Sequence, residues 1–376
     1  MAVKSPMRVL GFMTGTSLDA VDMAVLETDG EEIIGLGPAG EKKLDPGVRA
    51  LLEAAIADAL RLKPGDPIPA SFAPAAAAIA AEHVAAGEAF MRDNGILPGD
   101  LDLIGLQGQT VLHAPPGPDR AEGQTIQLID AGAVARGLGV PTVYDLRSDD
   151  VAAGGQGAPF VPVYHRALAQ SLEREGPLVV VNIGGVSNIT YIDGADTLIA
   201  CDTGPGNALL DDFMLRTMSK PFDCEGRLAA QGAVDEAWVA AAMQHPFFAR
   251  LPPKSLDRND FASLVLRDMP PADGAATLTA LTAAAIARIV PLLPKPPKSW
   301  IVAGGGARNL TMLRMLRERL APATVEAADT LGWSADAIEA QAFGFLAARG
   351  LKGLPLSYPA TTGVPIPMTG GVIARP

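Results

Sequence analysis

Cysteine and clustered positive charge are what this sequence has least of. Its 376 residues include only two cysteines, Cys201 and Cys224, which form neither a CxxC pair nor a disulfide framework. Such sparse cysteine is typical of a reducing, cytoplasmic compartment. Lysine and arginine number 30 against 42 acidic residues, which gives a formal net charge of −12. Because no basic stripe offsets this charge, the surface should repel a phosphate backbone, and we expect no nucleic-acid partner.

Long apolar segments and metal-ligand patterns are also missing. The longest stretch of low charge, PIPASFAPAAAAIAA, is mostly alanine and is broken by prolines, so we expect no membrane span. The N-terminal MAVKSPMRVLGFM indicates a first strand rather than a signal peptide. The histidines lack the spacing of zinc ligands and are expected to be structural: His83, His113, His165 and His245.

What the sequence does contain is enough chain for two domains. Hydrophobic residues make up 48% and charged residues 19%, a composition that suits a soluble folded protein. Strand pairs and strand–turn–helix segments occur in both halves, which predicts two related α/β domains. Proline and glycine crowd together in residues 152–163, AAGGQGAPFVPV, as in a hinge. We therefore expect an N-terminal α/β domain over residues 1–155 and a C-terminal one over 156–376, whose last helix could pack back on the first domain.

Several segments have clear local signatures. MRVLGFM and DMAVLET predict a hairpin, and TLIACDTGPGN predicts a strand that leads into the helix ALLDDFMLRTM. Ser334 is expected to cap a helix over SADAIEAQAFGFLAARGL. Two apolar helical stripes are expected. Leu209, Leu210, Phe213 and Met214 should share one face of one helix, and Leu310, Leu313, Leu316 and Leu320 should form the buried stripe of another.

Four turns combine a strand end with small residues: MTGTSLDAVD, NIGGVSN, DTGPGN and AGGGARN. Glycine lets backbone N–H groups approach an anion closely, and the third and fourth turns lead into helix N-termini. One such turn is more typical of an ordinary tight turn, but four at strand ends favour a polyphosphate ligand. The chain lacks GxxxxGK[ST] and has no GxGxxG after its first strand, so backbone, hydroxyls and Mg²⁺ would have to hold the phosphates. The residues expected to bind this ligand are Gly15, Thr16, Ser17, Leu18, Asp19, Ala20, Val21, Asp22, Gly184, Gly185, Gly204, Gly206, Gly304, Gly305, Gly306 and Asn309.

The order of these turns resembles the sugar kinase/Hsp70/actin superfamily, in which two RNase H-like α/β domains surround a nucleotide-binding cleft. More closely, the chain resembles the anhydro-N-acetylmuramic acid kinase family in GFMTGTSLDAVDMAVLE, GQTVLH, DLRSDDVAAGGQGAPFVP, NIGGVSN, DTGPGN, GGGARN and IEAQAFGFLA. The resemblance implies a kinase that uses ATP and Mg²⁺ in peptidoglycan recycling. It would convert 1,6-anhydro-N-acetylmuramic acid, with water, to N-acetylmuramic acid 6-phosphate and ADP. A homodimer is common in the resembled family.

The resemblance also implies roles for single residues. Asp202 would be the catalytic base, although the residues alone leave an Asx-turn cap equally open. Asp19 would hold the metal or cap its own turn. The residues implied for the sugar are Gln109, Thr110, Asp145, Arg147 and Glu339. Arg147 suits the lactyl carboxylate because a guanidinium binds it through two hydrogen bonds, with a surface ion pair to Asp149 or Asp150 as the alternative.

Two stretches depart from the family pattern. Gln107 stands where the family usually has histidine, and PPKSLDRNDF, residues 252–261, differs in its middle. Two rival functions stay open at this point. One is another small-molecule kinase of the same fold that uses Asp202 as base. The other is an actin-like or chaperone-like ATPase, which would give no reason for the stretch DLRSDDVAAGGQGAP.

Overall fold

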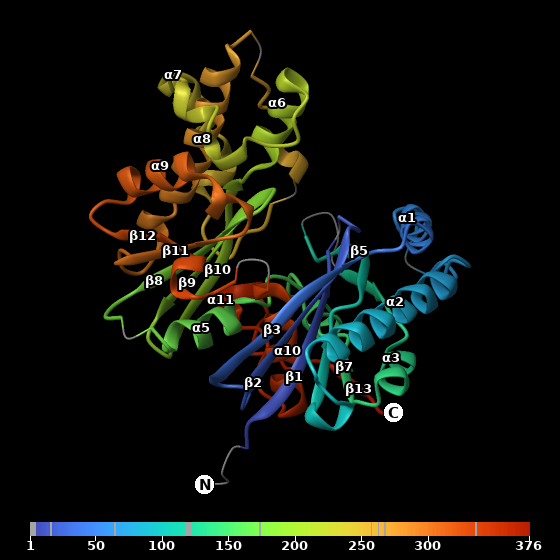
Figure 1. Cartoon of the computed structure of the whole chain (residues 1–376). Helices are drawn as coiled ribbons and strands as arrows, with labels where there is room; N and C mark the ends of the chain where they lie inside the picture. The colour runs from blue at the N-terminus through green and yellow to red at the C-terminus, as the bar shows by residue number, and fades with distance from the viewer. Residues whose placement is uncertain are drawn as a thin grey trace. The chain divides into compact units, whose positions relative to one another are not determined.

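The computed structural model describes residues 5–15, 17–63, 65–117, 122–172, 174–256, 258–261, 263–266, 268–334 and 337–376. The chain divides into two compact units (Figure 1): unit 1 is Met1–Leu172 with Ala337–Pro376, and unit 2 is Glu173–Asp336. Each unit contains a sheet with both parallel and antiparallel neighbours, flanked by helices, which confirms the α/β fold class. The division expected at residues 155 and 156 differs from these units, since residues 156–172 and 337–376 are compact with unit 1.

Unit 1 is built around one large sheet. Its strands are β1 (Met7–Thr14), β2 (Ala20–Thr28), β3 (Ile33–Lys43), β4 (Leu103–Leu106), β5 (Gln109–Ala114), β6 (Gln124–Leu128), β7 (Thr142–Tyr144) and β13 (Val372–Ala374). Its helices are α1 (Pro46–Ala59), α2 (Phe72–Asp93), the 3-10 turn η1 (Pro98–Asp100), α3 (Ala131–Leu138), α4 (Ser148–Ala152), α5 (Pro162–Gln170), α10 (Ile338–Leu351) and α11 (Pro359–Thr362). The sheet has the order β13-β7-β4-β1-β2-β3, and β5 and β6 form a separate hairpin. The β1–β2 hairpin expected from the sequence is confirmed.

The two faces of this sheet receive different helices. Leu10 and Phe12 of β1 point into a core that includes Ile79 and Phe90 of α2. His83 of α2 lies in the same layer, where its ring nitrogens bond to Thr14 Oγ1 (3.2 Å) and Ile79 O (2.7 Å). Burial lowers the pKa of His83 to about 4, so this histidine is neutral and structural, as expected.

The opposite face of the sheet is covered by α10, which lies directly on two glycines. Gly11 of β1 and Gly105 of β4 are neighbours across the sheet. A Cβ atom at Gly11 would lie 1.8 Å from the Ala340 carbonyl oxygen, and one at Gly105 would lie 2.3 Å from that of Phe343. Only a backbone without side chains allows a helix to approach this closely. The C-terminal segment is therefore an integral layer of unit 1 (Figure 1).

Unit 2 has a five-stranded sheet of order β10-β9-β8-β11-β12. Its strands are β8 (Leu178–Ile183), β9 (Val186–Asp193), β10 (Thr197–Pro205), β11 (Ser299–Ala303) and β12 (Thr324–Ala327). Its α-helices are α6 (Ala208–Met218), α7 (Glu236–Ala242), α8 (Pro271–Ala287) and α9 (Leu310–Leu320). Its 3-10 turns are η2 (Cys224–Gly226), η3 (Ala229–Gln231), η4 (Pro246–Ala249), η5 (Arg258–Phe261), η6 (Val290–Leu292), η7 (Gly305–Arg308) and η8 (Ala328–Leu331). The sequences of β8 and β11 are mostly apolar because both are central strands of the sheet.

Helix α8 is the core helix of unit 2. It packs against α6, α7 and α9, and its residues join the main apolar cluster of the unit. The segment Pro271–Leu292 is long and apolar enough to cross a membrane, but 67% of its most apolar window is buried inside the fold. This burial favours a core helix over a membrane span.

Most segments expected from the sequence are present, with two corrections. Leu310 is 62% exposed, whereas Leu313, Leu316 and Leu320 are buried; Leu310 is the first residue of α9 and extends past the core. Ser334 does not cap α10, which begins at Ile338 after Ala337 without a side-chain cap. Helix α6 has the bounds expected.

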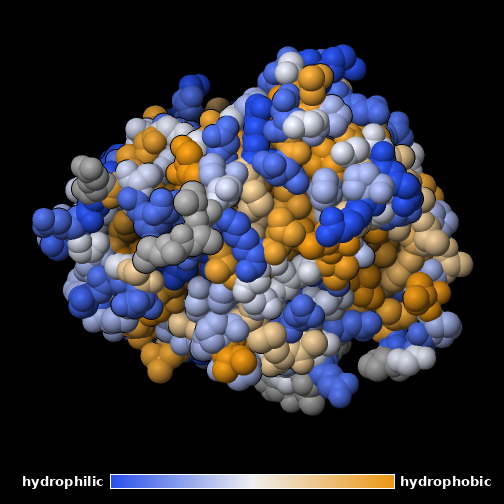
Figure 2. All heavy atoms as spheres, turned by 90° about the horizontal axis from the view of Figure 1, so that it is seen from below, coloured by the Kyte–Doolittle hydropathy of each residue, from blue (hydrophilic) through white to orange (hydrophobic). Residues whose placement is uncertain are grey.

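Some large apolar side chains reach the surface, among them Leu60, Ile68 and Leu97. Figure 2 shows apolar and polar residues mixed over the face seen there. Singly exposed apolar residues are normal in folded domains, so they do not identify a partner surface.

We predict that Gly11→Ala destabilises the protein by about 3 kcal/mol, because the added methyl would meet the backbone of α10 and backbone cannot move aside cheaply. Chemical denaturation of the purified variant measures this change. Gly99→Ala is the control, since a Cβ there meets no atom within 4 Å, and it should stay within about 0.5 kcal/mol of wild type. Equal denaturation midpoints for the two variants would contradict the close packing of α10.

Candidate active site

The turn between β1 and β2 carries the first predicted phosphate site, in unit 1. The Ser17 hydroxyl donates to Asp19 Oδ1 (2.7 Å), and the Ala20 N–H donates to the same oxygen (3.0 Å). Asp19 thus caps the turn with one oxygen while its side chain stays exposed, where a cation can reach it. The cap and the metal role are therefore compatible. Thr16, also expected here, lies outside the described residues.

Not every residue of this turn can offer its side chain to a nucleotide. Leu18 and Val21 belong to the apolar core of unit 1, and Ala20 is also buried. Leu18 adopts a left-handed backbone with φ of 55°. Asp22 is half-buried on β2, opposite Met13. Contacts from Leu18, Ala20 and Val21 to a nucleotide would have to come from the backbone.

Gln109 and Thr110 begin β5 and lie beside this turn. Gln109 is fully buried, and its Nε2 donates to the Gly15 carbonyl (3.4 Å). The Thr110 hydroxyl oxygen accepts from Gln107 Nε2 and from Gln127 Nε2, each at 3.3 Å. The structure therefore brings both predicted residues together with the phosphate turn, and adds Gln107 and Gln127 to the group.

Arg147 is held by aromatic rings and by one carbonyl. Its Nη1 donates to the Gly157 carbonyl (2.6 Å), and its guanidinium lies 5.5 Å from the Phe160 ring centre and 5.8 Å from that of Phe343. Burial lowers the pKa of Arg147 to about 10, and the charges of Glu339 and Asp150 oppose this change. Arg147 therefore stays cationic at neutral pH, as binding of a carboxylate requires.

The alternative role expected for Arg147 is a surface ion pair with Asp149 or Asp150. Among the described residues, Arg147 forms no such ion pair. Asp150 is buried, and its carboxylate accepts from Gly157 N–H (2.7 Å), the Ser357 hydroxyl (2.5 Å) and the Thr362 hydroxyl (2.6 Å). Asp150 thus anchors the loop that supports Arg147.

Two further acidic residues predicted for the sugar lie in unit 1. Asp145 has a left-handed backbone, φ 53°, and accepts from the Ser148 hydroxyl (2.5 Å). Glu339 lies in the first turn of α10 and keeps its side chain in contact with solvent. Surrounding protein raises the pKa of Glu339, and the positive charge of Arg147 lowers it. Arg147 and Glu339 are thus within electrostatic reach of each other.

Asp202 lies on β10 in unit 2, at a bulge between Asp202 and Gly204. Its carboxylate Oδ2 accepts from Leu256 N–H (2.8 Å), and its own N–H donates to the Lys254 carbonyl (2.9 Å). This carboxylate bond comes from 54 residues away, so Asp202 is not used as an Asx-turn cap of its own turn. Burial raises the pKa of Asp202 to about 6, against the effects of the Leu256 N–H and the Lys254 charge. A carboxylate with this pKa can accept a proton near neutral pH.

Lys254 supports Asp202 from the neighbouring segment. Its side chain is buried, and its Nζ donates to the Phe247 carbonyl (3.2 Å) and lies 4.5 Å from the centre of the Phe247 ring. Burial lowers the pKa of Lys254, as do the charges of Arg250 and Arg288. The side chain of Arg258, farther along this divergent stretch, is not described.

The three glycine turns of unit 2 pack against one another. Gly206 N–H and Ala208 N–H donate to the Gly185 carbonyl (2.9 and 3.2 Å), and Asn207 N–H donates to that of Gly184 (2.7 Å). A Cβ at Gly206 would lie 2.2 Å from the Gly184 oxygen, and one at Gly304 would lie 2.3 Å from Asn182 Oδ1. These two glycines are therefore required by packing inside the unit.

Other glycines of these turns have no such packing reason. A Cβ at Gly184, Gly185 or Gly305 would meet nothing closer than 3.5 Å. Gly204 and Gly306, in contrast, are packed against Phe248 and Ile183. The open positions are those where a ligand could approach the backbone.

A pocket of about 680 Å³ lies beside these turns, wholly within unit 2. It is lined by Asn207, Leu210, Asp211, Phe222, Asp223, Cys224, Glu225, Gly305, Arg308, Asn309 and Leu310. Asn309 also caps α9 by accepting from Met312 N–H (2.9 Å). The volume suits a drug-sized or nucleoside-sized ligand, and two of the predicted residues, Gly305 and Asn309, are in its wall.

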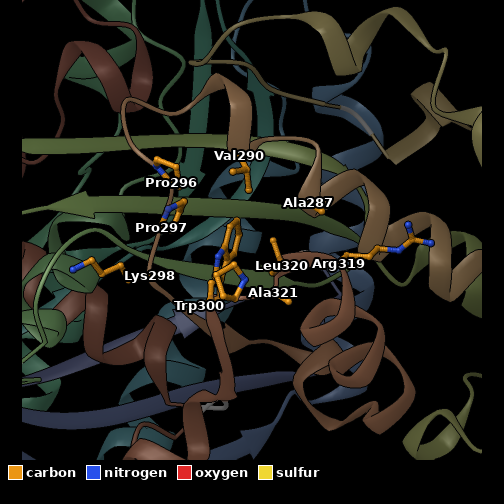
Figure 3. Close-up of a pocket in the computed structure, with 11 residues that line it drawn as sticks. Ala287, Val290, Pro296, Pro297, Lys298, Trp300, Arg319, Leu320 and Ala321 are labelled. Carbon is orange, nitrogen blue, oxygen red and sulfur yellow. The ribbon is translucent and has the colours of Figure 1, made fainter.

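A second pocket of unit 2, about 510 Å³, has a different position (Figure 3). Trp300, Lys298 and Leu320 line it, at the amino end of β11, whereas the glycine turn follows the carboxyl end of that strand. Ligands of α/β folds bind at the carboxyl ends of the strands, so the first pocket is the better candidate for a ligand site.

Sequence reasoning missed several residues of these sites. Gln127, Leu256 and the segment Phe222–Glu225 carry no local motif, because each reaches its site through contacts distant in sequence. The described residues contain no cluster of three or more histidine, cysteine, aspartate or glutamate side chains that could hold a metal.

Comparisons with known proteins identify the family to which this chain belongs. Residues 7–376 match the family described as "Anhydro-N-acetylmuramic acid kinase". A protein of that name from Rhodopseudomonas palustris is 65% identical over 370 residues, covering 98% of this chain and 100% of the relative. Another, from Bradyrhizobium diazoefficiens, is 66% identical over 367 residues, with 98% and 99% covered.

Solved structures align with far lower identity. The activator of the 2-hydroxyisocaproyl-CoA dehydratase from Clostridium difficile with bound ADPNP has a TM-score of 0.43 at 10% identity, over 92% of this chain and 96% of that one. A ROK family glucokinase from Streptomyces griseus in complex with glucose and AMPPNP has a TM-score of 0.40 at 15% identity, over 91% and 99%. The identification rests instead on the sequence match, which spans almost the whole length of both chains. This chain belongs to the anhydro-N-acetylmuramic acid kinase family.

Proposed function

We propose that this anhydro-N-acetylmuramic acid kinase uses Asp202 as the general base of its reaction. The enzyme converts the anhydro-sugar to N-acetylmuramic acid 6-phosphate at the expense of ATP. The observation that carries the proposal is the environment of Asp202: one carboxylate oxygen is held by Leu256 N–H, and burial raises the pKa to about 6. A base fixed in this way and ionised at neutral pH can accept a proton from water.

The reaction then follows from the bonds involved. Asp202 takes a proton from a water molecule, whose oxygen bonds to the anomeric carbon of the sugar. The bond from that carbon to O6 breaks, and O6 attacks the γ-phosphoryl group, so that ADP leaves. One water and one ATP are consumed for each sugar. Alignment and neutralisation of the phosphoryl charge supply the rest of the rate increase.

Unit 2 would bind the nucleoside and would provide three of the four proposed phosphate turns, while the β1–β2 turn of unit 1 would provide the fourth. The pocket of about 680 Å³ would take the nucleoside, because it opens next to the turns at Gly184, Gly185 and Gly305. Backbone N–H groups at these open glycines provide the type of donors that phosphates need. Gly204, Gly206, Gly304 and Gly306 would shape the turns, and Asn309 would fix the start of α9.

Unit 1 would bind the sugar and the metal. Arg147 would pair with the lactyl carboxylate, and Gln109, Thr110, Asp145 and Glu339 would contact polar groups of the ring. Asp19 fits Mg²⁺ because the ion is commonly held by one or two carboxylates together with substrate phosphates. When bound, Mg²⁺ would neutralise charge on the transferred phosphoryl group.

We also propose a cytoplasmic homodimer. Cys201 and Cys224 are both free thiols, as expected in a reducing compartment. We propose the homodimer from the resemblance to the family.

The test of the whole function is the fate of solvent oxygen. After incubation with Mg²⁺, ATP and ¹⁸O-labelled water, mass spectrometry should find phosphorylated N-acetylmuramic acid with one ¹⁸O at the anomeric carbon. A phosphorylated sugar without ¹⁸O would indicate an ordinary hydroxyl kinase, and ATP hydrolysis with the anhydro-sugar unchanged would indicate another substrate.

We predict that Asp202→Asn lowers kcat by at least about 10²-fold with little change in the KM for ATP, because the amide keeps the shape of the side chain but cannot accept the proton. Asp196→Asn is the matched control, since Asp196 is an exposed carboxylate just before β10, away from the bulge. Steady-state kinetics measures both variants. Near-normal turnover of Asp202→Asn would remove Asp202 from the role of base.

The pH dependence of kcat/KM should report the ionisation of Asp202. Because Asp202 must be ionised to act as base, kcat/KM for the sugar should fall as the pH drops through about 6, at saturating ATP. Lys254→Met removes a positive charge that lowers the pKa of Asp202. The fall in kcat/KM should therefore occur at higher pH in this variant than in wild type. A pH profile that is flat between pH 5 and 7 would argue against this assignment.

A further inference from the structure

A network of polar side chains runs through unit 1 from His113 to the phosphate turn. Gly157, whose carbonyl accepts from Arg147, packs close to the start of this network: a Cβ at Gly157 would lie 3.0 Å from His113 Cε1. His113 Nδ1 lies 3.2 Å from the Thr125 hydroxyl, which accepts from Gln127 Nε2 (2.7 Å).

The second half of the network starts at Gln127. Its Nε2 also reaches the Thr110 hydroxyl (3.3 Å), which Gln107 Nε2 shares at the same distance. The neighbouring Gln109 continues to the carbonyl of Gly15 (3.4 Å). Polar contacts thus extend from His113 to the carbonyl of the phosphate turn, with Arg147 packed near their start.

This network leaves polar atoms unpaired. In the described part of the chain, the buried side-chain atoms without a hydrogen-bond partner are Gln107 Oε1, Gln109 Oε1, Gln127 Oε1, Arg147 Nε and Tyr191 Oη. The three glutamine carbonyls belong to the network. Gln107 and Gln109 are themselves more than nine-tenths buried. An unpaired buried polar group is costly, and native proteins keep few of them.

The hydrogen bonds on Thr110 explain why the carbonyls are unpaired. Gln107 and Gln127 both direct their NH₂ groups at one hydroxyl oxygen, and these donors occupy its lone pairs. Each amide is therefore oriented with its carbonyl away from Thr110. The result is a pair of buried acceptors set around one hydroxyl, next to the phosphate turn.

We propose that the Gln107 and Gln127 carbonyls bind the hydrogen-bond donors of the sugar and so contribute to substrate specificity. This inference rests on the proposed function and adds two residues to the sugar site. In the anhydro-sugar, a single oxygen bridges C1 and C6, and O3 carries the lactyl ether. The 4-hydroxyl and the acetamido N–H are therefore the donors of the ring. Neutral carbonyl acceptors suit them, and these acceptors would be left unpaired by a sugar without such donors.

The amide of Gln107 fits this role as a neutral acceptor. Gln107 replaces the histidine that the resembled family usually carries, and an amide cannot titrate. A glutamine can nevertheless orient its carbonyl by donating to Thr110, as it does here. The site thus keeps an acceptor whose strength does not depend on pH.

The test replaces Gln127 by methionine, which keeps the length of the side chain and removes its polar atoms. Gln124→Met is the matched control: Gln124 lies on β6 three positions earlier, so its side chain is on the opposite face of the strand. Kinetics with anhydro-N-acetylmuramic acid and with ATP, and melting temperatures with and without the sugar, are measured for wild type and both variants.

For Gln127→Met, we expect the KM for the sugar to rise about 10-fold, as for the loss of one buried hydrogen bond, with the KM for ATP unchanged. The melting temperature without ligand should stay within about 2 °C of wild type, because the variant also removes an unpaired carbonyl. The sugar should raise the melting temperature of the variant less than that of wild type. Gln107→Met should repeat this pattern, which keeps the test valid if Gln127→Met does not fold.

Other outcomes separate the two proposals. If wild type phosphorylates the anhydro-sugar and both glutamine variants keep its KM, the sugar role of Gln107 and Gln127 is wrong while the function stands. A large loss of ligand-free melting temperature with an unchanged KM would make the glutamines structural. A wild-type enzyme that neither binds nor phosphorylates the sugar would overturn both proposals.

Discussion

The close approach of backbone to backbone at a few glycines is the constraint on which the rest of this structure depends. In unit 2, Gly206 lies against the Gly184 carbonyl and Gly304 against Asn182, so three turns from separate parts of the chain form one assembly. In unit 1, Gly11 and Gly105 let α10 lie directly on the sheet. A single added methyl at these points would displace backbone, which packed interiors tolerate poorly.

The glycine assembly of unit 2 also fixes the position of Asp202, the proposed base. The strand that carries Asp202 ends in the turn that Gly206 locks against Gly184, and α6 begins at once after it. The Asp202 carboxylate is then held by Leu256 N–H rather than by its own turn. Because turn and carboxylate are fixed by different contacts, a phosphate bound at the turn would leave the hydrogen bond of the base intact.

Local patterns predicted much of this fold, because local patterns reflect local physics. The β1–β2 hairpin and the bounds of α6 follow from alternation, helical spacing and turn residues alone. The layer formed by α10 could not be predicted in this way, since nothing near Gly11 reveals that Ala340 will lie on it. The same limit applies to the site: glycine turns are visible as motifs, whereas Gln127 and Leu256 act through partners far along the chain. Leu310 fits a buried stripe by spacing, but the start of α9 extends beyond the core.

The two units differ in the kind of polar group that they leave unpaired or open, and this difference matches two kinds of ligand. Unit 2 offers glycine backbone and a helix N-terminus, which are donors and suit an anion. Unit 1 offers unpaired amide carbonyls, which are acceptors and suit hydroxyl and amide N–H groups, together with one fixed cation, Arg147. A sugar that carries both donors and a carboxylate matches that combination. The proposed place of the sugar in unit 1 therefore has a chemical basis that is independent of any motif.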